Sequence, residues 1–112
     1  MMKQLDIIKV FVEGWTRGRG GNLYIDGNTL YSYGKHFPLA VRLISAHKDN
    51  SSKNRYAFIL NNDSYSKTTT KHKNWFIKEA GEENIIKKVN TQEMGRWMKM
   101  EDVREPMLNA LD

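Results

Sequence analysis

Cysteine is absent from the 112-residue chain, and proline occurs only twice. Without cysteine there is no disulfide framework, no thiolate metal site and no cysteine nucleophile. Long apolar runs are missing too, because the N-terminal stretch MMKQLDIIKVFVEG carries charges within a short apolar segment. It therefore resembles neither a signal peptide nor a membrane span. We expect a protein of the reducing cytoplasm that does not associate with membranes.

Motifs that are typical of enzymes are also missing. The chain has no Walker loop, no HExxH, no GxSxG and no dinucleotide-binding glycine fingerprint. Its three histidines, His36, His47 and His72, lack the spacing of a metal site, and no carboxylate pair stands out. The sequence therefore predicts no catalytic residues, no metal and no cofactor.

Positive charge is the main feature of what is present. Lysine and arginine number 18 against 13 aspartates and glutamates, which gives a net charge of +5. An excess of this kind predicts a polyanionic partner, with DNA or RNA first. The alternative is a protein whose lysine-rich surface is only solvated.

Hydrophobic patterning predicts a single α+β domain over 1–112, with its core motif region at 22–80 and a C-terminal helical extension at 82–112. Short runs rich in β-branched and aromatic residues predict strands, and these are 6–13, a hairpin over 22–33 that turns at Gly27, 39–44 and 55–61. The polar stretch 45–55 predicts a loop. We expect a mainly antiparallel sheet of about four strands, one helix across a face and short C-terminal helices.

The segment Gly14–Gly21 reads GWTRGRGG, and its glycines predict a flexible loop. An arginine can bind phosphate while an indole stacks on a base, as in proteins that bind single-stranded nucleic acid. Trp15, Arg17 and Arg19 are therefore candidate contacts. The alternative is a plain connection between two strands.

The hairpin over 22–33 places three tyrosines on the face opposite its core residues, namely Tyr24, Tyr31 and Tyr33. These rings suit an exposed platform on which bases stack. They equally suit a second packed face whose hydroxyls reach polar partners. The sequence leaves both interpretations open.

A helix is predicted over about 68–80, with Ser66 or Thr68 as its N-cap and Gly81 as its end. Helical spacing places His72 on an inner face with the aromatic residues. A second, basic face comprises Lys67, Lys71, Asn74 and Lys78. We expect the first face to pack on the sheet and the second to face solvent.

Two histidines suggest one possible chemistry. His36 ends the strand that carries Tyr33, and His72 lies beside Lys71 at the start of the helix. Two imidazoles and a lysine can cleave RNA without metal, as base, acid and cation, if both rings reach one phosphate. The alternative is that His72 is a partly buried core residue.

Two strings resemble a known pair of motifs. LYSYGKHFPLA (30–40) and YSKTTTKH (65–72) are similar to segments of small uncharacterised proteins and domains of bacterial and archaeal viruses. The resemblance covers about 22–80 and implies a phage or mobile-element origin, not an activity. The matching positions are Tyr31, Ser32, Tyr33, Gly34, His36, Pro38, Ala40, Tyr65, Ser66, Thr68, Thr69, Lys71 and His72.

Three functions follow as hypotheses. The first is a small basic phage-type protein that binds DNA or RNA without catalysis. The second is a viral inhibitor that binds a host protein such as a polymerase or a defence nuclease, as anti-CRISPR proteins do. The third is a ribonuclease that uses His36 and His72. The candidate nucleic-acid contacts are Trp15, Arg17, Arg19, Tyr31, Tyr33, His36, Lys67, Lys71, His72 and Lys78.

Overall fold

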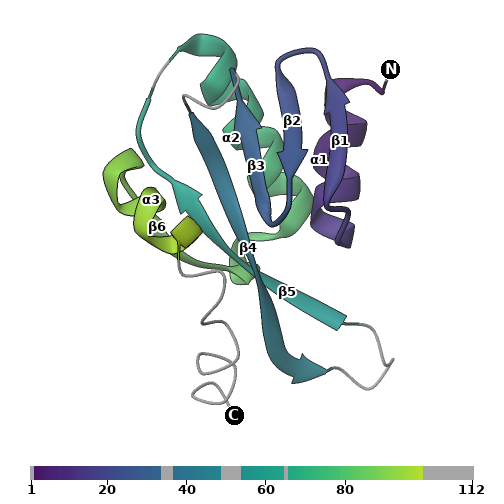
Figure 1. Cartoon of the computed structure of the whole chain (residues 1–112), viewed down its shortest axis with the longest axis vertical. Helices are drawn as coiled ribbons and strands as arrows, with labels where there is room; N and C mark the ends of the chain where they lie inside the picture. Colours follow the sequence, from purple (N-terminus) through teal and green to yellow (C-terminus); the bar gives the residue numbers. More distant parts are fainter. Residues whose placement is uncertain (1, 34–36, 49–53, 65, 100–112) are drawn as a thin grey trace.

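The protein is a six-stranded sheet with helices on both faces (Figure 1). The computed structural model describes residues 2–33, 37–48, 54–64 and 66–99. In chain order the elements are α1 (Gln4–Glu13), β1 (Arg17–Gly20), β2 (Leu23–Asp26), β3 (Thr29–Ser32), β4 (Pro38–Lys48), β5 (Asn54–Asn61), α2 (Lys67–Ala80), the 3-10 turn η2 (Glu82–Asn84), β6 (Ile85–Val89) and α3 (Thr91–Lys99). The strands lie side by side in that order, and every adjacent pair is antiparallel except β5 and β6.

Two apolar cores lie on opposite sides of the sheet. On one side α1 and α2 pack on the strands, and the rings of Phe11 and Phe76 lie 6.0 Å and 5.1 Å from that of Phe58. On the other side α3 buries Met94 against a smaller cluster that includes Ile59 of β5. Alternate residues of β5 thus enter both cores, so both faces of the predicted strand at 55–61 are covered.

Residues 6–13 form helix rather than the predicted strand. The buried residues Ile7, Ile8 and Phe11 follow helical spacing, but the run of β-branched residues favoured a strand. The helix ends at Gly14, whose φ is 116°, with the N–H of Gly14 bonded to Phe11 and that of Trp15 bonded to Val10. This is a Schellman motif, which only a residue tolerant of positive φ accommodates well.

The segment Gly14–Gly21 is not the predicted loop throughout, because its second half contains the edge strand β1 (Arg17–Gly20). Gly18 and Gly20 face α1, and a Cβ on Gly20 would lie 2.9 Å from Ile7 and would collide with the Met2 carbonyl oxygen. The glycines therefore let α1 approach the strand closely. Their role is packing, and all four residues of β1 pair in register with β2.

We expect Gly20→Ala to lower the free energy of unfolding by about 1–3 kcal/mol, because α1 must move away from β1 to admit the methyl group. Urea denaturation measures the difference. Gly95→Ala in α3 is the matched control, since nothing lies within 4 Å of its added Cβ. That change should be neutral or stabilise by up to about 1 kcal/mol. Equal effects of the two substitutions would contradict the packing role of Gly20.

The remaining predictions are partly confirmed. The hairpin is present, with the turn at Gly27-Asn28 and a φ of 64° at Gly27. The run 39–44 lies in β4, but much of the predicted loop 45–55 is strand, because β4 continues to Lys48 and β5 begins at Asn54. The domain is α+β and its sheet is mainly antiparallel, as predicted, but the sheet has six strands where about four were expected, and one pair is parallel. The last part of the predicted C-terminal helical extension, 100–112, lies outside the described residues.

Candidate functional site

Helix α2 forms as predicted and presents a fixed basic face. The Ser66 hydroxyl accepts a hydrogen bond from the Thr69 N–H at 3.1 Å, so Ser66 is the N-cap. Gly81 ends the helix with a φ of 86°. Phe76 and Ala80 are buried against the sheet, so the opposite face of α2 is turned to solvent.

The exposed side of α2 carries a row of four polar residues, named here the α2 stripe: Lys67, Lys71, Asn74 and Lys78. Their spacing is i, i+4, i+7 and i+11, which keeps them on one line along about three helical turns. The single acidic residue of the helix, Glu79, lies about 100° around the axis from that line. Lys71 Nζ lies 4.9 Å from the centre of the Trp75 ring, a cation–π contact that restricts its motion.

The arginines of β1 lie on the other side of the molecule. Because Gly18 and Gly20 face α1, Arg17 and Arg19 point to the opposite face of the sheet, and both are exposed. α1 and α2 share one core, so the α2 stripe and the two arginines are separated by the sheet (Figure 1). The predicted nucleic-acid contacts therefore do not form a single surface.

The tyrosine face is packed more than exposed. Tyr24 and Tyr31 stack, with ring centroids 4.8 Å apart and an interplanar angle of 10°, and Tyr31 is 8% exposed. Burial raises the pKa of Tyr24, and the Asp26 carboxylate raises it further while Arg19 opposes them. Tyr33 turns out of the strand with a φ of 62°. This arrangement leaves little ring surface for a base.

Ser32 and His72, one from each of the two motifs, meet inside the protein. The Ser32 hydroxyl lies 2.8 Å from His72 Nδ1, and His72 Nε2 lies 2.9 Å from Gln4 Oε1. Gln4 Oε1 only accepts, so Nε2 carries the hydrogen and the Ser32 hydroxyl donates to Nδ1. Ser32 and His72 are fully buried, and burial lowers the pKa of the imidazole, with Lys71 adding to the effect. A neutral ring without access to solvent joins β3, α2 and α1. His36 lies outside the described residues.

Arg42 of β4 is a buried charged residue for which the sequence predicted no role. Arg42 is 2% exposed, and its guanidinium donates to the carbonyl oxygens of Phe11 at 2.6 Å, Trp15 at 2.9 Å and Gly27 at 3.2 Å. It also donates to Asn28 Oδ1 at 3.0 Å and stacks 4.8 Å from the centre of the Phe11 ring. The signal in the sequence was a lone charge in the apolar run LAVRLI. Its role is to hold the end of α1 and the β2–β3 turn to β4.

A second polar network closes the end of the parallel strand pair. Buried Asn61 donates to the Pro38 carbonyl at 2.9 Å and to the Thr91 hydroxyl at 3.0 Å. Asp63 accepts from the Thr91 N–H at 2.7 Å, which lowers the pKa of this carboxyl. Lys73 donates to the Asp63 carbonyl at 2.7 Å, and burial lowers the pKa of its amine. Because these groups bond to each other, the network is structural.

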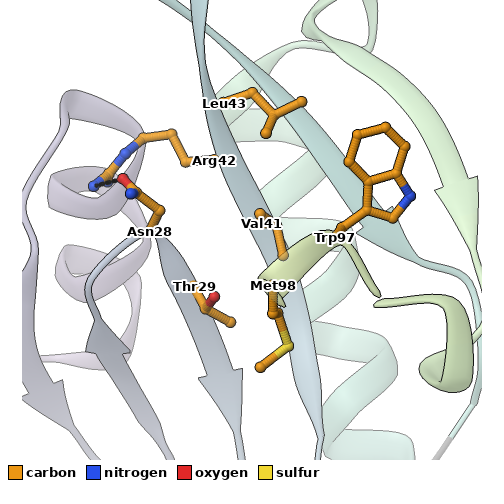
Figure 2. A pocket seen from close by; sticks show the side chains of 7 residues that line it. All are labelled: Asn28, Thr29, Val41, Arg42, Leu43, Trp97 and Met98. Atoms are coloured by element: carbon orange, nitrogen blue, oxygen red, sulfur yellow. Dashed lines mark hydrogen bonds between the residues drawn. The ribbon is translucent and has the colours of Figure 1, made fainter. Parts of the chain in front are cut away.

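A small cleft opens where α3 meets the sheet. Trp97 and Met98 reach over β4, while Asn28 and Arg42 lie together on its far side (Figure 2). The lining residues are Asn28, Thr29, Val41, Arg42, Leu43, Trp97 and Met98. Its volume is about 10 Å³, room for roughly one water molecule. The cleft is therefore too small for a substrate.

Comparison of the chain with protein-family models, with curated proteins and with solved structures finds no match. Within the described ranges, no three histidine, aspartate or glutamate side chains gather as metal ligands. No helix in this part of the chain has both the length and the apolar character needed to cross a membrane.

Proposed function

We propose that this protein binds nucleic acid without catalysing a reaction, and that the α2 stripe is its main contact. The observation that carries the proposal is the line of three exposed lysines and one asparagine along a single rigid helix. Lysine ammonium groups bind phosphates as point charges, and an asparagine amide adds hydrogen bonds to a backbone or a base edge. The net charge of +5 adds long-range attraction.

The dimensions of the stripe suit a nucleic-acid backbone. Eleven residues of helix span roughly 16 Å, which is the length of a few successive phosphates. The inner face of α2 is held by Phe76 and Ala80, so the lysines project from a fixed axis. At the first turn, the positive end of the helix dipole adds to the charge of Lys67 and favours an anion there.

Absence of catalysis is supported by the place of His72. A general acid or base must come within hydrogen-bond reach of the atom it serves. The His72 ring is fully buried and both of its nitrogens are bonded within the protein. A ribonuclease mechanism would need this ring at the surface, so we favour a binding protein.

The triple substitution Lys67→Gln, Lys71→Gln and Lys78→Gln should weaken binding to a labelled oligonucleotide at least about tenfold near 0.1 M salt. The slope of log affinity against log salt should also fall by about three, since each lysine releases about one counterion. Fluorescence anisotropy with single-stranded DNA, duplex DNA and single-stranded RNA measures both quantities and ranks the three ligands.

A second triple variant, Lys3→Gln, Lys9→Gln and Lys99→Gln, is the matched control. These lysines are also exposed, so net charge falls equally while the α2 stripe stays intact. Its affinity should fall much less than that of the first variant. Equal losses would show that binding depends on net charge alone and would overturn the assignment to α2. No binding by the unmodified protein at low salt would end the nucleic-acid proposal.

A further inference from the structure

The outer side of β1 is an open strand edge. Within the described part of the chain, β1 pairs with β2 alone. The Thr16 carbonyl accepts a hydrogen bond from the Gly27 N–H in the β2–β3 turn at 2.9 Å, so the backbone polar groups of Thr16 point toward β2. Along a strand, the N–H and C=O groups of successive residues point alternately to the two sides. The N–H and C=O groups of Gly18 and Gly20 therefore point toward β2. Those of Arg17 and Arg19 point outward, so the edge offers both donors and acceptors.

The side chains at this edge are those that dominate protein interfaces. Arg17 and Arg19 are exposed, and neither forms an ion pair with another described residue. The Trp15 side chain is 50% exposed, but its backbone is held in place. The backbone N–H donates to the Val10 carbonyl, and the backbone carbonyl accepts from Arg42 at 2.9 Å. The backbone on either side of the exposed indole is therefore fixed. Tryptophan and arginine are enriched among residues that carry binding energy, and a preordered anchor loses little entropy on binding.

The opposite edge of the sheet is arranged differently. On β6, Lys87 and Lys88 form ion pairs with Glu93 at 3.4 Å and Glu82 at 3.5 Å. The pairing of β6 with β5 also shifts register at its start. Neutralised charge and irregular pairing are common ways to discourage further strands. β1 is regular through all four of its residues. Arg17 lies opposite Asp26 and Arg19 lies 5.9 Å from the centre of the Tyr24 ring, but neither arginine forms an ion pair with another described residue.

The geometry points to β1 as the docking edge for an extended acidic segment of a partner protein, which adds to the sheet as a further strand. Its backbone would pair with the outward groups of Arg17 and Arg19. Carboxylates at alternate positions would lie beside the two guanidiniums, because cross-strand neighbours share a face. An apolar residue next in line would contact Trp15.

Two other occupants fit this edge less well. A phosphate chain would use the outward N–H groups but would place negative charge against the outward carbonyl oxygens. A second copy of the protein would set arginines against arginines across the new strand pair, which is unfavourable. A strand with acidic side chains satisfies the donors, the acceptors and the charges together. This surface lies across the sheet from the α2 stripe, so the inference stands apart from the proposed function.

The experiment uses the full chain and a short labelled peptide that alternates glutamate with threonine and valine. We expect saturable binding, with amide shifts in ¹H–¹⁵N spectra at Arg17 and Arg19 and slower exchange of those two amide hydrogens. Arg17→Gln with Arg19→Gln should weaken binding at least about tenfold. Lys87→Gln with Lys88→Gln removes the same charge from the other edge and should leave the affinity unchanged.

Two further probes make the result decisive. A peptide with proline at its centre lacks a backbone donor, so strand addition predicts that it binds much more weakly. If it binds as well as the parent peptide, the contact is not a strand. If a single-stranded oligonucleotide, and not the peptide, protects the two amides, the edge is a nucleic-acid surface. Absence of binding at about millimolar peptide also overturns the proposal.

Discussion

Replacing Arg42 with methionine is expected to lower the free energy of unfolding by about 3–5 kcal/mol. Methionine fills a similar volume, so the loss reports mainly on hydrogen bonds and charge. The Trp15 and Gly27 carbonyls and the Asn28 side chain lose the guanidinium as a donor, and the Phe11 carbonyl loses it as well but keeps the Gly14 N–H. Each buried acceptor left without a donor costs about 1–3 kcal/mol before relaxation. Urea or thermal denaturation measures the change.

Arg42→Lys separates the charge from the geometry of the guanidinium. A lysine keeps the positive charge but offers its donors from one atom, so it cannot reach acceptors on α1 and on the β2–β3 turn together. It also loses the stacking on Phe11 and on Tyr56, whose ring centres lie 4.8 Å and 5.3 Å from the guanidinium carbon. We expect Arg42→Lys to lose at least half as much stability as Arg42→Met. A lysine variant as stable as the parent would mean that charge alone suffices.

Arg42 also shows why the sequence predicted the strands better than their environment. An arginine in LAVRLI is compatible with an edge strand that keeps its charge in water, and periodicity cannot distinguish this from burial. Burial of the arginine depends on the carbonyls that converge on it, and these come from α1, from the loop that follows α1 and from the β2–β3 turn. Those elements are distant in sequence, and one of them was predicted as a strand. The local pattern therefore predicted the strand β4 but not the structural role of Arg42.

The other errors have similar physical causes. DIIKVFVE contains both a strand pattern and a helical one, and the packing of Ile7 against glycines of β1 selects the helix. The glycines of β1 are typical of a loop when the sequence is considered alone. Their packing role is evident only once α1 is known to lie over β1. Helix α2 was predicted well because its N-cap, its final glycine and its two faces are all local signals. The division of the predicted contacts between two sides of the sheet depends on topology, which no local pattern determines.

His72 lies in a buried contact with Ser32 and Gln4. His72→Ala should lower the free energy of unfolding by about 2–4 kcal/mol, because it leaves a cavity and removes the partner of both polar side chains. Asn74→Ala, on the exposed face of the same helix, is the matched control and should change stability by less than about 0.5 kcal/mol. If the two substitutions cost the same, the contact does not stabilise the fold.

The same contact predicts how stability depends on pH. Burial, with Lys71 nearby, holds the pKa of folded His72 below its usual value of about 6.5. The unfolded chain therefore takes up a proton at a higher pH than the folded protein does. Stability from this group is complete well above pH 6.5 and falls as the pH drops below it, by at most about 1.4 kcal/mol per pH unit. Urea titrations between about pH 5 and pH 8 on the parent and on His72→Gln isolate the effect, because both proteins keep the other two histidines of the sequence. The parent should lose more stability than the variant over this range, and parallel profiles would mean that the folded ring is free to take up a proton.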